Sequence, residues 1–269
     1  MTDNDDTATS LTPGSVAWFT DIITPRLGYS SLRDWQIDLG REIFEGRDVV
    51  CVAPTGSGKS ALLHIPLMAA KEAKGRVLGM SIAPTKILCE DQAQAASARG
   101  LRAIALHSDS IRVAKAEGRN LIREIMADEW DLFVLPPELL NSDELATLLH
   151  GQTPNAAPKS KVPELDLVFI DECHLVREHG DEFREAYKKI VFLRGRLPVG
   201  IPWVAVTATL PPGEMTEGVL KSLGFCEGEY RGAQNFCTCP LKARVSSSTR
   251  LSRSSEQSDC LGVSEQNAE

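Results

Sequence analysis

The chain has 269 residues, of which 42% are hydrophobic and 25% are charged, and its formal net charge is −8 at pH 7. These are ordinary globular proportions, so they exclude collagen-like, fibrous and wholly disordered proteins. The acidic balance excludes a protein coated in basic surface, so any nucleic-acid contact must be local. The N-terminus is acidic where a secretory signal is basic, and the apolar runs are too short to cross a bilayer. We therefore expect an intracellular protein with no membrane contact.

Strand-like and helix-like segments alternate along most of the chain. Short apolar runs rich in β-branched residues predict strands, and longer amphipathic runs predict helices. In chain order we expect an amphipathic segment at 15–28, a helix at 32–45, a strand at 48–53 with a helix beginning near residue 59, a strand at 76–83, a helix at 85–99, a strand at 101–106, a helix at 111–129, a strand at 131–135, a helix at 137–149, a strand at 165–171, a helix at 183–193, a strand at 203–207 and a helix at 213–223. This alternation predicts an α/β fold, with a parallel sheet covered by helices on both faces.

The two ends of the chain differ in composition from its middle. Residues 1–13 are polar and acidic, whereas the last part of the chain is rich in serine and poor in large apolar side chains. Such segments bury too little apolar surface to offset the entropy lost on ordering. We expect a disordered N-terminus at 1–13, one folded domain at 14–228 and a disordered tail at 229–269.

A glycine-rich segment, A-P-T-G-S-G-K-S at 53–60, follows the strand at 48–53. Its glycines let the backbone curl so that successive N–H groups point inward, and the following helix adds its positive end, which suits bound phosphates. In such loops the lysine reaches the β- and γ-phosphates and the last hydroxyl ligates Mg²⁺. The pattern usually begins with glycine, where this chain has Ala53. A glycine-rich turn with an exposed lysine is the alternative, but the position between strand and helix favours a nucleotide site. The predicted ATP-binding residues are Thr55, Gly56, Ser57, Gly58, Lys59 and Ser60, with Ser60 also a Mg²⁺ ligand.

A second motif, D-E-C-H at 171–174, ends the predicted strand at 165–171. The carboxyl ends of parallel strands form the ligand crevice of such sheets, so we expect this motif near Lys59. There Asp171 would hold Mg²⁺ and Glu172 would orient and deprotonate the attacking water. Alone, the motif could equally be the polar start of a helix. With the glycine-rich segment upstream, we predict a catalytic set of Lys59, Asp171, Glu172 and His174.

A third motif, A-V-T-A-T at 205–209, ends another predicted strand. The hydroxyls of Thr207 and Thr209 could bond His174 and couple it to the presence of phosphate. On spacing alone, threonines that cap a following helix are the simpler interpretation.

Together these motifs resemble a superfamily 2 helicase and, more narrowly, the RecQ-like DNA helicases, over about residues 20–225. The segment L-G-Y-S-S-L-R-D-W-Q at 27–36 is similar to the family segment that binds adenine. The resemblance implies that Tyr29 stacks on the base and that Arg33 and Gln36 read its edge. A flat aromatic face and an amide suit adenine on physical grounds as well. A helix face with a core tyrosine is the alternative.

Further segments resemble the parts of these helicases that contact DNA. They are A-P-T-K-I-L-C-E-D-Q at 83–92, L-H-S-D-S at 106–110 and V-L-P-P-E-L-L at 134–140. The resemblance implies contacts with the DNA strand at Thr85, Lys86, Ser108 and Glu138.

An aromatic-rich loop of the family is similar to residues 174–187, and the resemblance implies DNA contacts at Phe183 and Arg184. The family's tryptophan is His179 here and the following histidine is Asp181. The change removes a stacking platform worth about 1–3 kcal/mol per base. A helix that packs Phe183 on the sheet is the alternative interpretation.

The resemblance implies a single RecA-like P-loop NTPase domain that uses ATP and Mg²⁺, from a family that unwinds DNA in the 3′–5′ direction in repair and recombination. It also implies two partners, single-stranded or partly duplex DNA and a second RecA-like lobe. The second lobe supplies an arginine finger worth about 10³–10⁵ in rate. We therefore expect a first motor lobe that binds ATP and DNA and unwinds little DNA by itself. We expect the protein to be nuclear if the source is a eukaryote and cytoplasmic otherwise.

One alternative remains open, a non-motor ATP-dependent module that binds nucleic acid or regulates a partner. A P-loop kinase or transporter ATPase explains neither Gln36 nor the motifs at 171–174 and 205–209. A DEAD-box RNA helicase fits less well, because Cys173 and His174 depart from its motif and its upstream Pro-Thr-x-x-Gln segment is lacking.

Overall fold

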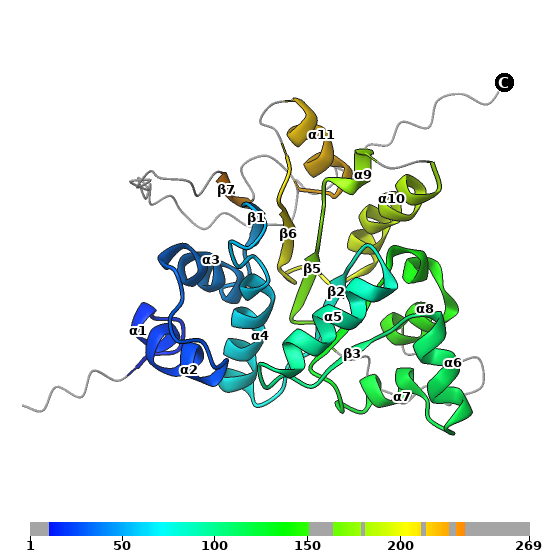
Figure 1. Cartoon of the computed structure of the whole chain (residues 1–269), viewed down its shortest axis with the longest axis horizontal. Helices are drawn as coiled ribbons and strands as arrows, with labels where there is room; N and C mark the ends of the chain where they lie inside the picture. The colour runs from blue at the N-terminus through cyan, green and yellow to red at the C-terminus, as the bar shows by residue number, and fades with distance from the viewer. Residues whose placement is uncertain (1–10, 151–163, 179–180, 211–213, 226–229, 235–269) are drawn as a thin grey trace, which may run out of the picture.

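Seven parallel strands form the centre of the structure, a computed structural model (Figure 1). It describes residues 11–150, 164–178, 181–210, 214–225 and 230–234. The strands lie in the order β3-β4-β2-β5-β6-β1-β7, and every pairing between neighbours is parallel. Their bounds are β1 Asp48–Val52, β2 Gly79–Ile82, β3 Ala103–Ala105, β4 Leu132–Leu135, β5 Leu167–Ile170, β6 Trp203–Thr207 and β7 Tyr230–Gln234.

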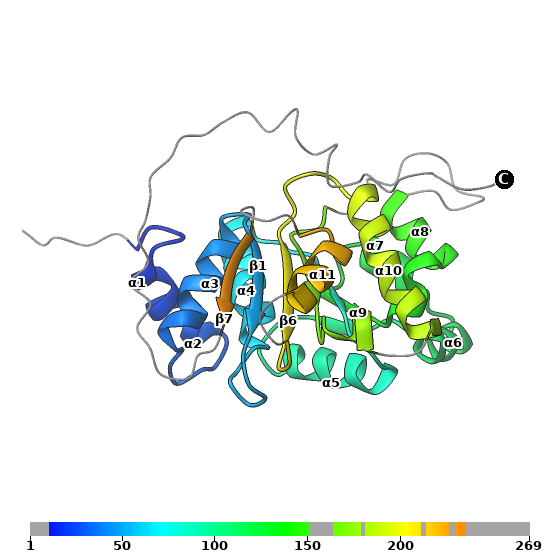
Figure 2. The ribbon, with the colours of Figure 1, turned by 90° about the horizontal axis from the view of Figure 1, so that it is seen from above.

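Helices cover both faces of this sheet (Figure 2). They are α1 Val16–Trp18, a π-helical turn η1 Phe19–Ile23, α2 Thr24–Arg26, α3 Asp34–Phe44, α4 Ala61–Lys74, α5 Lys86–Ser97, α6 Ser108–Ala116, α7 Leu121–Met126, a 3₁₀ turn η2 Pro137–Asn141, α8 Asp143–His150, α9 Leu175–Glu178, α10 Asp181–Arg196 and α11 Glu214–Ser222. Side chains alternate along each strand, so Val49 and Cys51 join the core under α3, α4 and α5, whereas Val50 and Val52 join the core under α7, α8, α10 and α11. The predicted α/β architecture is confirmed.

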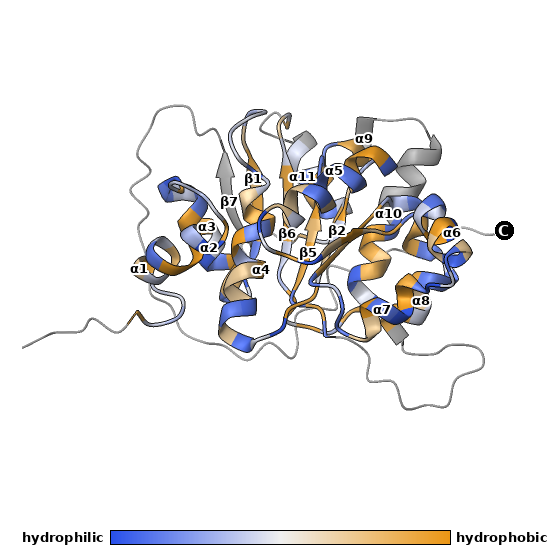
Figure 3. Ribbon diagram, turned by 60° about the horizontal axis from the view of Figure 1, so that its bottom comes forward, coloured by the Kyte–Doolittle hydropathy of each residue, from blue (hydrophilic) through white to orange (hydrophobic). Residues whose placement is uncertain are grey.

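Hydropathy follows the same arrangement (Figure 3): the strands are mostly apolar, and the helices mix apolar with polar residues. Strands buried on both faces need such continuous apolar runs. Within the described part of the chain, every helix is too short or too polar to serve as a membrane span.

Two predicted helices are each broken in the structure. The helix expected at 111–129 is α6 and α7, because Gly118 has a φ of 75° and the Asn120 side chain accepts the Arg123 N–H at 3.1 Å to begin a new helix. The helix expected at 137–149 is η2 followed by α8, with the Ser142 hydroxyl accepting the Leu145 N–H at 3.2 Å. Caps override the amphipathic periodicity at both breaks.

The sheet also extends beyond the predicted domain end at residue 228. Strand β7 pairs with β1 along its whole length, from Tyr230 opposite Asp48 to Gln234 opposite Val52. An edge strand is held by main-chain hydrogen bonds along one side, so it does not need the apolar run from which strands were predicted. The predicted tail at 229–269 therefore includes a strand. Residues 1–10 and 235–269, for which disorder was also predicted, lie outside the described residues.

Candidate active site

The three motifs singled out in the sequence meet at the carboxyl end of the sheet, where main-chain hydrogen bonds join them. The Ala53 N–H donates to the Thr207 carbonyl at 3.0 Å, which ties the glycine-rich loop to the end of β6. The Cys173 N–H donates to the Val206 carbonyl at 3.0 Å, and the Asp171 N–H to the Ile82 carbonyl at 2.9 Å. The ends of β1, β2, β5 and β6 are thus fixed relative to one another.

The loop at 54–60 turns sharply between β1 and α4. Gly56 and Gly58 have φ angles of 77° and 90°, which lie in the left-handed region that favours glycine. A Cβ added at Gly58 would lie 2.5 Å from the Gln36 amide nitrogen, so a side chain there would displace the Gln36 amide as well as strain the backbone. Thr55, Gly56 and Ser60 are exposed, and α4 begins at Ala61, two residues later than predicted.

Lys59 lies within the loop itself. Its ammonium donates to the Ala53 carbonyl at 2.8 Å and to the Pro54 carbonyl at 3.3 Å. The Ser57 hydroxyl oxygen is buried and, among the described residues, has no hydrogen-bond partner. A buried donor in that state is costly unless a ligand satisfies it. The loop therefore offers a fixed cation, an unsatisfied hydroxyl and a helix N-terminus, which is a donor set that fits phosphate.

Arg33 and Gln36 support this loop from the first turn of α3. The Arg33 guanidinium donates to the Ser57 carbonyl at 2.5 Å, and the Gln36 amide donates to the Gly58 carbonyl at 2.9 Å. The Gln36 oxygen accepts the Arg33 N–H at 2.9 Å and so caps the helix. These two hydrogen bonds use one N–H and one lone pair of the Gln36 amide, which is half of its hydrogen-bonding capacity. The base-reading role of both residues stays a prediction.

Tyr29 lies against two residues that the sequence motifs did not include. Its hydroxyl is 3.2 Å from the His64 Nδ1, and the Arg99 guanidinium lies over its ring at 4.0 Å from the centroid. Burial raises the pKa of Tyr29, and the Arg99 charge opposes that shift. Burial, helped by Arg99, lowers the pKa of His64 to about 4, so this imidazole is neutral at pH 7. Stacking of Tyr29 on a base stays a prediction.

Asp171 accepts hydrogen bonds on both of its carboxylate oxygens. Its carboxylate accepts the Glu172 N–H at 2.9 Å on one oxygen and the Gln92 amide at 2.5 Å on the other. Burial and the Glu172 charge raise the pKa of Asp171, while its hydrogen bonds and the Lys59 charge act in the opposite direction. The structure thus brings Asp171 within the electrostatic range of Lys59.

Glu172, His174 and Thr207 form a second cluster beside it. The His174 Nδ1 lies 2.7 Å from the Thr207 hydroxyl and 3.2 Å from the Glu172 carboxylate. Thr207 is fully buried, and its hydroxyl oxygen accepts a hydrogen bond from the Thr209 N–H at 3.2 Å. The side chain of Thr209 is exposed. Glu172 has a φ of 45°, a backbone conformation that costs energy for a residue with a Cβ and is often found at functional sites. The expected contact between His174 and Thr207 is present, and Thr209 takes part through its main chain.

The predicted DNA-contacting residues lie on neighbouring elements. Thr85 caps α5 by accepting the Leu88 N–H at 3.3 Å, and the next residue, Lys86, pairs with Asp109 at 2.7 Å. Asp109 adjoins Ser108, so this ion pair brings the first turns of α5 and α6 together. Glu138 is exposed on η2. The side chains of Phe183 and Arg184, on α10, lie outside what the structure describes.

Oxygen ligands for a cation are available beside the loop. Ser60 and Asp171 offer a hydroxyl and a carboxylate, the hard ligands that Mg²⁺ prefers. No group of three or more His, Cys, Asp or Glu side chains forms a metal cage in the described ranges. That donor set fits Mg²⁺, which takes few protein ligands and keeps phosphate oxygens and water.

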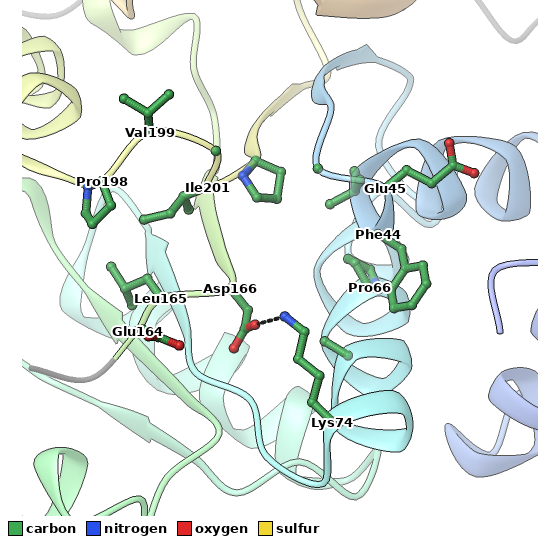
Figure 4. Close-up of a pocket in the computed structure, with 15 residues that line it drawn as sticks. Phe44, Glu45, Pro66, Lys74, Glu164, Leu165, Asp166, Pro198, Val199 and Ile201 are labelled. Atoms are coloured by element: carbon green, nitrogen blue, oxygen red, sulfur yellow. Dashed lines mark hydrogen bonds and ion pairs between the residues drawn. The ribbon is translucent and has the colours of Figure 1, made fainter. Parts of the chain in front are cut away.

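A cavity of about 550 Å³ lies at the other end of the sheet, before β1, β5 and β6 (Figure 4). Phe44, Pro66 and Val199 line it with apolar surface, and Lys74 points at Asp166, with which it pairs at 2.5 Å. All of the residues predicted for the site lie outside its lining. This cavity is therefore distinct from the site at the carboxyl end of the sheet.

Comparison with known proteins gave matches over most of the described chain. The model of the family described as DEAD/DEAH box helicase matches residues 33–217. The ATP-dependent DNA helicase RecQ of Synechocystis sp. is 31% identical over 185 residues, which are 68% of this chain and 35% of that protein. The probable ATP-dependent DNA helicase RecS of Bacillus subtilis is 33% identical over 68% of this chain and 32% of its own length. The chain thus spans about a third of these curated relatives.

Among solved structures, the Pyrococcus furiosus Hef helicase domain aligns with 75% of this chain and 38% of its own, at a TM-score of 0.49 and 21% identity. At that level the likeness adds nothing to the argument.

Proposed function

Because the chain belongs to the DEAD/DEAH box helicase family and has RecQ helicases among its relatives, we propose that it is the ATP-binding motor lobe of a RecQ-type DNA helicase. The observation that carries this proposal is the meeting of Lys59, Asp171 and Thr207 at one end of the sheet. Each comes from a different motif, and an ATP-driven motor needs all of them in one place: a phosphate site, an acid and a sensor.

The residues of the crevice have complementary roles in ATP hydrolysis. The N–H groups of the loop, the Ser57 hydroxyl and Lys59 would hold the β- and γ-phosphates, and Ser60 with Asp171 would hold Mg²⁺. When bound, Mg²⁺ neutralises the charge on the phosphate oxygens. Catalysis of this kind depends mostly on positioning and electrostatic stabilisation.

Glu172 is the proposed general base. Thr207 donates to its carboxylate at 3.4 Å, and His174 lies 3.2 Å away, so two neighbours fix its orientation. A carboxylate held in this way can align a water molecule with the γ-phosphate and take its proton. Because His174 also contacts Thr207, a change at the phosphates would reach β6 through this pair.

DNA is the proposed second substrate, single-stranded or partly duplex, and 3′–5′ unwinding in repair or recombination belongs to the same proposal. The support is the similarity to proteins named as DNA helicases, together with the first turns of α5 and α6. The Thr85 hydroxyl, the Lys86 ammonium and helix N-termini are typical partners of phosphates in a strand backbone.

A second RecA-like lobe is the proposed protein partner. It would close the crevice and add an arginine finger, which contributes about 10³–10⁵ in rate. The chain by itself should therefore hydrolyse ATP slowly.

The test is the ATPase rate of the purified chain with and without single-stranded DNA, then after addition of a purified second lobe of a RecQ helicase. We expect slow hydrolysis at first and DNA-stimulated hydrolysis once the lobe is added. Glu172→Gln should bind ATP and lose turnover, whereas Lys59→Ala should lose binding as well. Binding of ATP and DNA without any restored turnover would instead identify a non-motor module.

A further inference from the structure

A chain of polar side chains connects the middle of the sheet to Asp171. The Ser81 hydroxyl, on β2, donates to the Gln92 oxygen at 2.7 Å. The Gln92 amide nitrogen, on α5, donates to the second carboxylate oxygen of Asp171 at 2.5 Å. Ser81 is fully buried, and Gln92 and Asp171 are partly buried. The consecutive elements β2 and α5 thus share one short network with Asp171, which lies 79 residues beyond Gln92.

Gln92 occupies a position on α5 that an apolar side chain would ordinarily fill. The buried residues of this helix are Cys89, Ala93 and Ala96, a spacing that marks the face packed on the sheet. Gln92 lies on the same face, three residues after Cys89. A polar group there is costly unless it is hydrogen-bonded, and both ends of this amide are.

The order of donors fixes which way the amide points. Because the Ser81 hydroxyl donates to the Gln92 oxygen, the nitrogen must face Asp171. The other carboxylate oxygen of Asp171 takes the Glu172 N–H, so the carboxylate is held from two sides.

We propose that Gln92 is a positioning residue that holds the Asp171 carboxylate in the orientation needed to bind the magnesium–nucleotide complex. The proposal rests on the proposed function, since it concerns the same site. Gln92 would act through Asp171, whose carboxylate its amide contacts. Partners that orient a metal ligand are typically worth about 10–100-fold in metal affinity.

The experiment uses the full chain and a fluorescent ATP analogue, titrated in Mg²⁺ and again in excess EDTA. Gln92→Leu keeps the size of the side chain and removes both hydrogen bonds. We expect its dissociation constant in Mg²⁺ to rise about 10–100-fold, with the value in EDTA within about twofold of wild type. Gln94→Leu, on the exposed side of the same helix, is the matched control and should change neither value.

A double-mutant cycle separates positioning from mere folding. If Gln92 acts through Asp171, Gln92→Leu should add nothing to the loss of Mg²⁺ dependence in an Asp171→Asn background. Ser81→Ala leaves Gln92 in place but frees its orientation, so it should shift the Mg²⁺ affinity in the same direction by less. If Gln92→Leu does not fold, the Mg²⁺ affinity of Ser81→Ala tests the proposal in its place.

Equal weakening of binding with and without Mg²⁺ would overturn the proposal, as would a lower melting temperature with unchanged Mg²⁺ dependence. A wild-type chain that binds no nucleotide under either condition would instead count against the proposed function, so the two failures are distinguishable.

Discussion

Aspartates stand at both ends of the parallel sheet, and the two ends use them differently. At the amino end, three of them each accept a backbone N–H from the neighbouring strand and pair with at least one cation. Asp48 accepts the Trp203 N–H and pairs with Arg194. Asp131 accepts the Arg102 N–H and pairs with the Arg102 guanidinium and with Lys71. Asp166 accepts the Leu78 N–H and pairs with Lys74. These carboxylates join neighbouring strands and the helices that cover them.

Asp171, at the carboxyl end, receives its hydrogen bonds from an amide and from the next N–H in the chain. The pKa of Asp131 lies below its ordinary value and that of Asp171 lies above it. The acids of the amino end therefore stabilise the fold as charged groups, whereas the surroundings of Asp171 disfavour its charged form. Shifted acids of the second kind are typical of functional sites, and they cost stability.

The largest effect should follow from removing the buried acid of the amino end. The side chain of Asp131 is fully buried and accepts the Arg102 N–H at 2.7 Å, so Asp131→Ala leaves that N–H unpaired and breaks two ion pairs. We expect the free energy of unfolding to fall by about 3–4 kcal/mol, measured by urea denaturation. The affinity of the folded variant for ATP should not change.

The control at the same end is Glu164→Ala, whose carboxylate is 73% exposed beside Arg76. An exposed pair of this kind is worth about 0–1 kcal/mol. Equal losses in the free energy of unfolding for Asp131→Ala and Glu164→Ala would show that burial does not determine how much an acid at the amino end stabilises the fold.

The next effect concerns two lysines at opposite ends of the same helix. Lys59 precedes α4 and faces the phosphate loop, and Lys74 ends α4 and pairs with Asp166. ATP at about 100 times its dissociation constant stabilises a binding protein by about 2.7 kcal/mol. Lys59→Ala should abolish the rise in melting temperature that ATP causes, and Lys74→Ala should preserve it. A preserved rise in Lys59→Ala would contradict the assignment of the loop.

Local signals were enough to predict most strands and the positions of the site motifs. Strand β6 has the bounds predicted, and β1 ends one residue short, because β-branched runs followed by turn residues mark their own limits. The break at Gly118 and Asn120 was missed, although glycine ends helices and asparagine begins them. Strand β7 could not be predicted, because neither of the two alternating sets of residues in its sequence is apolar.

The supporting residues of the site could not be predicted for a different reason. Gln92 bonds a residue 79 positions away and His64 one 35 positions away. No local pattern encodes such pairs, which depend on how α4 and α5 pack. One signal was available in retrospect, a glutamine on the buried face of an amphipathic helix.

A smaller effect should follow from Ser57→Ala in the phosphate loop. The buried hydroxyl has no hydrogen-bond partner in the described structure, and an unsatisfied buried donor costs free energy, so its removal should maintain or raise the stability of the ligand-free protein. If phosphate is the missing partner, affinity for ATP should fall about tenfold, the lower end for a hydrogen bond to a charged group. Isothermal titration with ATP measures this, and an unchanged affinity together with lower stability would assign the hydroxyl to the fold.

The smallest effect is a difference in the pH dependence of stability between the two ends. Burial raises the pKa of Asp131, but hydrogen bonds from Arg102 and Lys71 outweigh it and keep that pKa low. Its contribution is therefore present above the unfolded pKa of about 3.9 and lost as the pH falls through the folded pKa. Burial and the Glu172 charge raise the pKa of Asp171. Its contribution is present below about pH 3.9 and lost as the pH rises through the folded pKa.

Urea unfolding of metal-free protein across this acidic range can compare wild type with Asp131→Asn and Asp171→Asn. The advantage of wild type over Asp131→Asn should shrink as the pH falls, whereas wild type should gain on Asp171→Asn over the same interval. Each unit of difference between folded and unfolded pKa is worth about 1.4 kcal/mol. Because both variants remove one negative charge, a general effect of net charge would move them together. Slopes of the same sign would therefore mean that the position of an aspartate along the strand does not decide its role.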